Sequence, residues 1–117
     1  MKSRLSMEKR FMSSIKISQE IHNKMLHSIV EQTSSLRGKS QWIITAIENF
    51  LTIQDYPELV DIAAEMEDLT ETVSFRLPEK IMEQLDKAVI VIRRKYPTME
   101  GVKSNIIRAS IIQKLIR

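Results

Sequence analysis

Two short segments carry the side chains best suited to bind a polyanion, because basic and hydroxyl residues alternate there with apolar ones. The segments are SSIKIS (13–18) and TVSFRL (72–77). A period of two is typical of a strand whose two faces differ. The residues expected to face a core are Ile15, Ile17, Phe75 and Leu77. The opposite faces are polar and basic, and a two-stranded ribbon with such a face fits the major groove of B-form DNA.

Each predicted strand runs directly into a helix. Ser18 is a good N-cap for the first helix, and Pro78 suits the first turn of the second, where a missing N–H is no loss. These two junctions lie 60 residues apart. Helical spacing predicts one buried stripe on each helix. The stripes consist of Ile21, Met25, Ile29, Ile81, Leu85, Val89 and Ile92.

A second helix is predicted in each half of the chain. The only two glycines, Gly38 and Gly101, each precede a serine that can cap a new helix, Ser40 or Ser104. The segments that follow, WIITAIENFL and NIIRASIIQKLI, are apolar around most of their circumference, which indicates a central place in the core. Because the two caps lie 64 residues apart, the second half is predicted to hold about one extra helical turn, around RRKYPTMEG.

Charge is distributed in blocks along the chain. The 117 residues include 18 Lys and Arg against 15 Asp and Glu, but seven of the acids fall in the window 55–71, which contains no base. The remainder holds 18 bases and eight acids, a net charge of +10. Such asymmetry points to a polyanionic partner.

The acidic window is itself predicted to be a short docked helix between the two halves. Asp55-Tyr56-Pro57 is typical of a helix start, and the segment has no Gly or Ser. The apolar stripe expected to dock it consists of Leu59, Ile62, Ala63 and Met66.

Composition excludes several classes of protein. A hydrophobic content of 43% is typical of a globular chain, no apolar run approaches the ~18–20 residues that span a bilayer, and no secretory signal is present. The absence of Cys excludes disulfides, thiolate zinc sites and cysteine nucleophiles, and fits a cytoplasmic location. His22 and His27 are five residues apart rather than four, and no catalytic motif accompanies them. Neither an enzyme nor a metal or other cofactor is therefore predicted.

The segments TVSFRLPEKI and GVKSNIIRASI, and more weakly SSIKISQEI and GKSQWIITAI, resemble the ribbon-helix-helix family of DNA-binding proteins (the Arc/MetJ type). One copy of about 45 residues is too small to enclose a core, and its single strand has no partner. Two copies in one chain solve both problems. The first copy departs from the family pattern by having Ser18 where proline is common.

The resemblance implies a mainly α fold with a two-stranded antiparallel β-ribbon, formed as a tandem ribbon-helix-helix intramolecular pseudodimer. Its layout, with a Tyr-Pro linker, is similar to the tandem form found in plasmid relaxosome proteins. The expected parts are a basic N-terminal arm (1–11), copy one (12–53), an acidic linker that is helical (54–71) and copy two (72–117). A dimer in which two chains exchange strands stays open as an alternative.

The resemblance also implies which residues contact DNA. Base edges would be read by the outward residues Met12, Ser14, Lys16, Thr72, Ser74 and Arg76. Arg76 is the strongest candidate, because a guanidinium pairs bidentately with guanine, a contact worth about 1–3 kcal/mol. Helix N-termini with free N–H groups would bind phosphates at Lys39, Ser40, Lys103 and Ser104. The arm residues expected to add sequence-independent attraction are Lys2, Arg4, Lys9 and Arg10.

The resemblance implies sequence-specific binding of double-stranded DNA by a bacterial or plasmid-borne transcriptional regulator, repressor or activator, or by an accessory factor of conjugation. Self-association on adjacent sites is expected by family analogy, and the acidic linker is expected to lie away from the phosphates. The blander interpretation is that the outward residues of the strands form only a solvated face, and Trp42 is expected in the core. The alternative function is a small helical interaction module or antitoxin whose acidic linker helix binds a protein partner.

Overall fold

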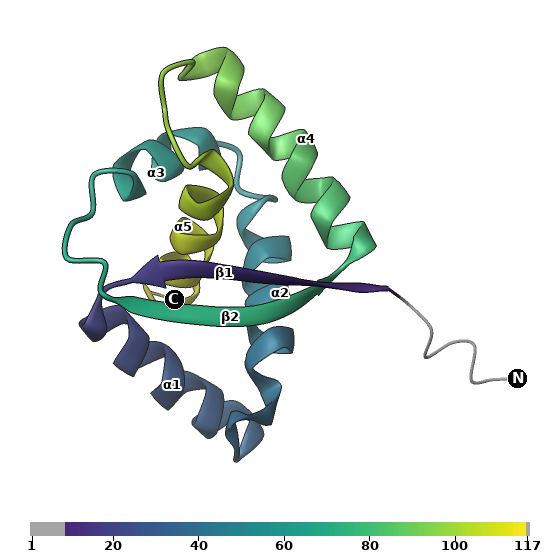
Figure 1. The fold of residues 1–117 in the computed structure, drawn as a ribbon, viewed down its shortest axis with the longest axis vertical. Coiled ribbons are helices and arrows are strands. Elements are labelled where there is room, and N and C mark those ends of the chain that lie inside the picture. The colour runs from purple at the N-terminus through teal and green to yellow at the C-terminus, as the bar shows by residue number, and fades with distance from the viewer. Residues whose placement is uncertain (1–8, 117) are drawn as a thin grey trace, which may run out of the picture.

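The computed structural model describes residues 9–116, which form five α-helices and one two-stranded antiparallel sheet (Figure 1). In chain order the elements are β1 (Arg10–Ile17), α1 (Gln19–Thr33), the 3-10 turn η2 (Leu36–Gly38), α2 (Lys39–Phe50), α3 (Tyr56–Ala63), β2 (Glu71–Pro78), α4 (Glu79–Lys95) and α5 (Val102–Ile116). A strand followed by two helices thus occurs twice, which is consistent with the predicted ribbon-helix-helix layout. No described helix is long and apolar enough to cross a membrane.

The two strands pair with each other along their whole length. Ser14 lies opposite Ser74 at the centre, Arg10 lies opposite Pro78 at one end, and Ile17 lies opposite Glu71 at the other. β1 begins at Arg10, three residues before the predicted start, because β2 extends far enough to give these residues cross-strand partners. Part of the predicted N-terminal arm is therefore strand.

The alternation of the strands divides the ribbon into two faces, as predicted. Ile15 is 5% exposed, Ile17 and Leu77 are fully buried, and Phe75 is 2% exposed. These side chains pack on α2 and α5, which both pass behind the ribbon in Figure 1. The core therefore lies directly beneath the ribbon.

The helices α1 and α4 lie on opposite sides of the ribbon (Figure 1) and each buries a stripe. Met25, Ile29, Ile81, Leu85 and Ile92 are buried, while Ile21 and Val89 are partly buried. The Ser18 hydroxyl accepts a hydrogen bond from the Ile21 N–H at 3.2 Å and caps α1 as predicted. Pro78 occupies the equivalent cap position of α4, with extended backbone, rather than the first helical turn.

The helices α2 and α5 pack together at the centre of the molecule, which confirms the interpretation of their apolar sequences. Ser40 and Ser104 do not cap them, because α2 begins at Lys39 and α5 begins at Val102. The prediction of a full extra turn in the second half is also wrong. α4 has 17 residues against 15 in α1, and the segment after it is one residue longer.

The two glycines that precede α2 and α5 meet different structural needs. A Cβ at Gly38 would lie 2.6 Å from the Thr33 Cγ2, so close approach of the two segments requires glycine there. Gly101 has a φ of +62° with open space around it, so its requirement is conformational.

The acidic segment contains a docked helix, α3, as predicted, but its buried face differs from the predicted stripe. Pro57, Val60 and Ala63 are buried, whereas Ile62 is 67% exposed. Apolar residues lie on two sides of this helix, so periodicity alone does not select which side packs. α3 begins beside α2, where the rings of Phe50 and Tyr56 are 5.9 Å apart.

Candidate nucleic-acid interface

All six predicted base-reading residues are exposed on the same face of the ribbon. They form three cross-strand pairs, because residues directly opposite each other in antiparallel strands project to the same side. The pairs are Met12–Arg76, Ser14–Ser74 and Lys16–Thr72. Met12 is 62% exposed. The face therefore carries a pair of serine hydroxyls at its centre and one cation toward each end.

The N-terminus of α2 is attached to the outer edge of β2 beside Arg76. The Ser40 hydroxyl accepts a hydrogen bond from the Arg76 backbone N–H at 3.0 Å. Ser40, the second residue of α2, therefore uses its hydroxyl to bind the strand. Lys39 and Ser40, both half-buried, are thereby held next to the ribbon as the phosphate-binding prediction requires.

α5 is attached to the opposite edge, on β1, through a residue that the sequence analysis missed. Arg108 is 6% exposed, and its Nε donates to the Lys16 carbonyl at 2.9 Å. Its Nη1 donates to the Asn105 Oδ1 at 2.6 Å, and the Asn105 amide donates to the Glu100 carbonyl at 3.0 Å. Burial lowers the pKa of Arg108. The feature of the sequence that could have identified Arg108 is its position as a single arginine within the otherwise apolar stretch of a central helix.

The two predicted phosphate-binding turns differ in their ion pairs. The Lys103 ammonium lies 3.3 Å from a carboxylate oxygen of Asp86 in α4. Lys39 forms no ion pair with any residue in the described range 9–116. Lys103 and Ser104 are half-buried in the first turn of α5. The positive charge that was expected at the start of α5 is therefore already partnered within the protein.

The acidic linker, which was predicted to lie away from the phosphates, contains a helix beside the start of α5, one of the two predicted phosphate-binding turns (Figure 1). Asp61 and Glu65 line the same pocket as Glu100 and Ser104. α3 packs its buried side against α5. Figure 1 shows α3 beside the upper end of α5.

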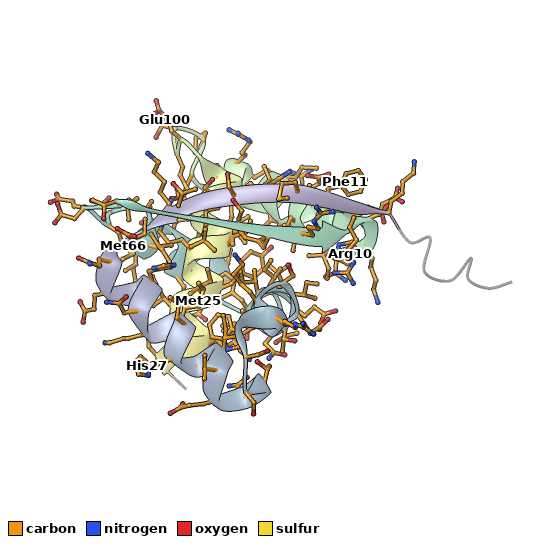
Figure 2. The ribbon with its side chains drawn as sticks, turned by 60° about the horizontal axis from the view of Figure 1, so that its bottom comes forward. Arg10, Phe11, Met25, His27, Met66 and Glu100 are labelled. Carbon is orange, nitrogen blue, oxygen red and sulfur yellow. The ribbon has the colours of Figure 1, made fainter. Side chains whose placement is uncertain are left out.

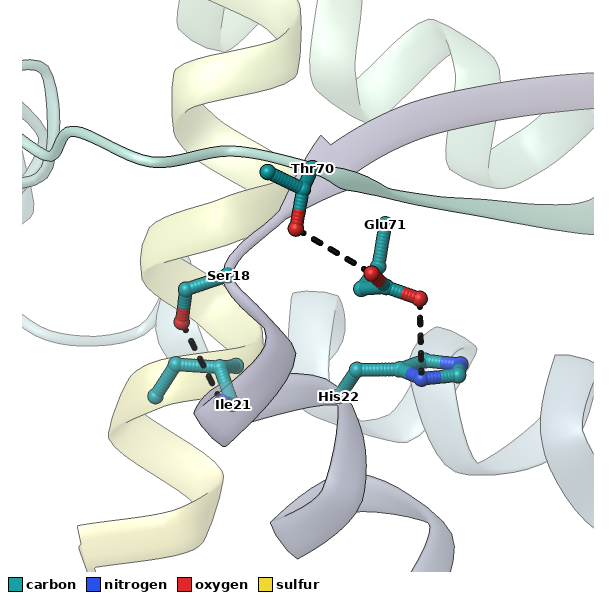
Figure 3. A network of polar contacts seen from close by, with 5 residues as sticks. All are labelled: Ser18, Ile21, His22, Thr70 and Glu71. Carbon is teal, nitrogen blue, oxygen red and sulfur yellow. Dashed lines mark hydrogen bonds and ion pairs between the residues drawn. The ribbon is translucent and has the colours of Figure 1, made fainter.

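Glu71, the last residue of the acidic window, lies in β2 rather than in the linker. Its carboxylate accepts a hydrogen bond from the Thr70 hydroxyl at 3.1 Å and lies 4.0 Å from the His22 Nδ1 (Figure 3). The other histidine, His27, is exposed on α1, below the ribbon in Figure 2. No group of three or more potential metal ligands occurs in the described part of the chain.

Trp42 belongs to the core, as predicted, and is not available to stack on a base. It is 3% exposed, and its Nε1 donates to the Ser28 hydroxyl at 3.0 Å. The Lys114 ammonium lies 5.2 Å from the ring centroid. Together these contacts attach α2 to α1 and to the end of α5.

The predicted arm is described only at its junction with the ribbon. Lys9 and Arg10 are exposed at the end of the ribbon where Arg10 pairs with Pro78 (Figure 2). Lys2 and Arg4 lie outside the described residues.

The chain matches no protein-family model, and no curated protein or solved structure shows significant similarity to it. Its function is therefore inferred from the arrangement of its own residues.

Proposed function

We propose that the chain is a tandem ribbon-helix-helix pseudodimer that binds double-stranded DNA by inserting its β-ribbon into the major groove. The observation that carries this proposal is the outward face of the ribbon, where three hydroxyl, two basic and one methionine side chain stand in three pairs above a buried opposite face. A major groove about 12 Å wide admits a two-stranded ribbon. Helix N-termini beside both edges of such a ribbon suit phosphate contacts.

The chemistry of the outward side chains gives sequence specificity. The Arg76 guanidinium pairs bidentately with O6 and N7 of guanine, and Lys16 offers a point charge to the same acceptors. Ser14, Ser74 and Thr72 donate and accept over short distances, while Met12 contacts a thymine methyl group. Because equivalent positions of the two strands hold different residues, the preferred site is an imperfect palindrome.

Such a protein acts as a transcriptional regulator or as an accessory factor of DNA transfer. Both roles use the same DNA-reading surface, so they differ in where the site lies rather than in how it is bound. Association of several copies on neighbouring sites suits either role.

The test is DNA binding by a variant that lacks both cations of the ribbon. Duplexes enriched from a randomised pool are labelled, and binding is followed by fluorescence anisotropy at increasing salt. The double change Arg76→Ala and Lys16→Ala should weaken binding about 30-fold or more, since each base contact is worth about 1–3 kcal/mol. The control, Lys24→Ala with Lys87→Ala, removes two exposed cations from the helices. If the wild-type protein enriches and binds no duplex at low salt, the proposal is wrong.

A second function is favoured by one observation on α3. Ile62 is 67% exposed between the acidic side chains Asp61 and Glu65, a combination that suits a basic protein partner with an apolar contact. In that case Ile62→Lys would release the partner and leave DNA binding unchanged. The Arg76 and Lys16 double variant would do the opposite.

A further inference from the structure

The two ends of the ribbon are unequal in charge. The Arg76 end comprises residues 10–12 and 76–78 with the N-terminus of α2 beside it, and the Lys16 end comprises residues 16–17 and 71–72 with α5 beside it. We propose that the protein binds DNA with a fixed polarity, in which the Arg76 end provides most of the affinity and the Lys16 end is weakened by neighbouring carboxylates. This inference rests on the proposed DNA-binding function.

Cationic side chains are concentrated at the Arg76 end. Arg76 stands on the reading face, and Lys9 and Arg10 lead into the strand beside it. The Ser40 contact holds the start of α2 against the same end, with half-buried Lys39 in its first turn.

At the Lys16 end, carboxylates share a pocket with the N-terminus of α5, which is the counterpart of the N-terminus of α2. Asp61, Glu65 and Glu100 line one pocket with Ser104. Two cations also line it, but Lys95 is paired with Glu58, and Arg108 donates to the Lys16 carbonyl and to Asn105. Glu100 is seen above the ribbon and Met25 below it in the view of Figure 2. A phosphate at the N-terminus of α5 would therefore face carboxylates at short range, where ionic screening is incomplete.

Equivalent positions in the two halves show how this difference is encoded. Asp86, which partners Lys103, has Leu26 as its counterpart 60 residues earlier, so α1 offers no such carboxylate to Lys39. The residue before each helix-initiating glycine also differs in sign, being Arg37 before α2 and Glu100 before α5. Arg37 and Glu100 are both exposed.

The first turns of α1 and α4 do not offset this difference. Glu20 is paired with Lys24 in α1 at 3.2 Å, and Glu79 is followed directly by Lys80 in α4. The first turn of α1 therefore adds one acid to the Lys16 end, partnered from the second turn by Lys24, and the first turn of α4 adds one acid and one base to the Arg76 end. The last turn of α4 carries three bases, Arg93, Arg94 and Lys95, whereas the last turn of α1 carries none, and of the three Lys95 is paired with Glu58. The proposed polarity therefore rests on the starts of α2 and α5 themselves and on the docking of α3.

Two consequences follow for DNA recognition. The half-site under Arg76 and Met12 should tolerate few base changes, whereas the half-site under Lys16 and Thr72 should tolerate more. The phosphate contact of Lys39 should also contribute more to the salt dependence of binding than that of Lys103, since each neutralised phosphate adds about 0.9 to the slope.

The experiment compares equivalent substitutions at the two ends, with the enriched duplex as probe. Lys39→Ala should reduce the slope of log affinity against log salt by about 1 and weaken binding severalfold, while Lys103→Ala should change affinity by less than about twofold. Glu100→Arg should strengthen binding and Arg37→Glu should weaken it. Glu48→Arg, at the far end of α2, is the control for net charge. Urea unfolding confirms that each exposed variant is folded.

The outcomes separate this inference from the function on which it rests. Equal losses from Lys39→Ala and Lys103→Ala, together with equal gains from Glu100→Arg and Glu48→Arg, would overturn the polarity while DNA binding stands. Failure of the wild-type protein to bind any enriched duplex would instead refute the proposed function. Substitution of each base pair of the bound duplex provides an independent measure, and the half-site contacted by Arg76 should show the larger losses.

Discussion

Arg108 is a buried cation whose hydrogen bonds join two segments that are 92 residues apart in the sequence. Its described partners are the Lys16 carbonyl and the Asn105 amide oxygen, both neutral acceptors. A guanidinium suits this position because its planar donors reach two acceptors at once. The residue therefore acts as a structural connection between α5 and the ribbon.

Removal of this side chain should destabilise the protein. Arg108→Ala leaves the part-buried Lys16 carbonyl and the buried Asn105 amide oxygen without this donor and removes packed methylene groups, so the free energy of unfolding should fall by about 2–4 kcal/mol. Arg108→Lys should recover only part of this loss. Urea titration followed by circular dichroism measures the change, with exposed Arg93→Ala as a control expected to stay within about 0.5 kcal/mol. An Arg108→Ala variant as stable as the control would show that these bonds make no net contribution.

At the scale of single residues, the sequence predicted well which strand side chains are buried and which are exposed. It predicted long-range contacts poorly. Alternation in the strands placed Ile15, Phe75 and their neighbours in the core and all six outward residues on the surface, because a strand allows only two sides. The contacts of Ser40 and Arg108 were not predictable in this way. Each joins a helix to a strand far away in the sequence, and local patterns do not specify such partners.

Among the elements, α3 is attached to α4 by polar groups as well as by its buried side. The Glu58 carboxylate pairs with the Lys95 ammonium and accepts a hydrogen bond from the Tyr96 hydroxyl at 3.3 Å. The hydrogen bond from Lys95 is the main reason that the pKa of Glu58 lies below its ordinary value of 4.5. The ionised carboxylate therefore favours the folded protein.

This pairing predicts a specific dependence of stability on pH. Because the pKa of Glu58 is lowered by folding, its contribution is present above pH 4.5 and is lost as the pH falls through the folded-state value. Glu58→Gln should therefore destabilise the protein at neutral pH, and the difference from wild type should shrink in acid. Urea unfolding at a series of pH values measures this difference. Glu67→Gln, which changes an exposed acid after α3, should show no such trend.

The existence of the elements was predictable, but some of their boundaries and orientations were not. The order of strands and helices followed from changes of period and from capping residues such as Ser18. The buried side of α3 was predicted wrongly because this eight-residue helix has apolar residues on more than one side. Only its packing against α5 selects Val60 over Ile62.

For the whole molecule, pairing of β1 with β2 within one chain predicts that the fold does not depend on a second copy. The midpoint of urea unfolding should therefore stay constant as the protein concentration is raised a hundredfold, since a strand-exchanged dimer would become more stable by mass action, by about 2.7 kcal/mol over that range. Sedimentation equilibrium at the same concentrations gives the mass directly. A midpoint that rises with concentration would support the exchanged dimer.

The distribution of charge over the whole molecule was only half predictable. Counting residues showed that the acids of 55–71 form one block and that the rest of the chain is basic. It did not show that α3 docks beside α5, so that Asp61 and Glu65 line one pocket with Ser104. In the proposed polarity, the difference in charge runs from one end of the ribbon to the other rather than from front to back.

The attachments of Ser40 and Arg108 also limit how the protein can associate with itself. A two-stranded ribbon has two outer edges, and unpaired backbone groups there can template a further strand and so lead to aggregation. Ser40 occupies the Arg76 N–H on one edge, and Arg108 occupies the Lys16 carbonyl on the other. A third strand cannot pair at these positions without displacing a core helix. The helices therefore keep the ribbon two strands wide and protect a small sheet from edge-to-edge polymerisation.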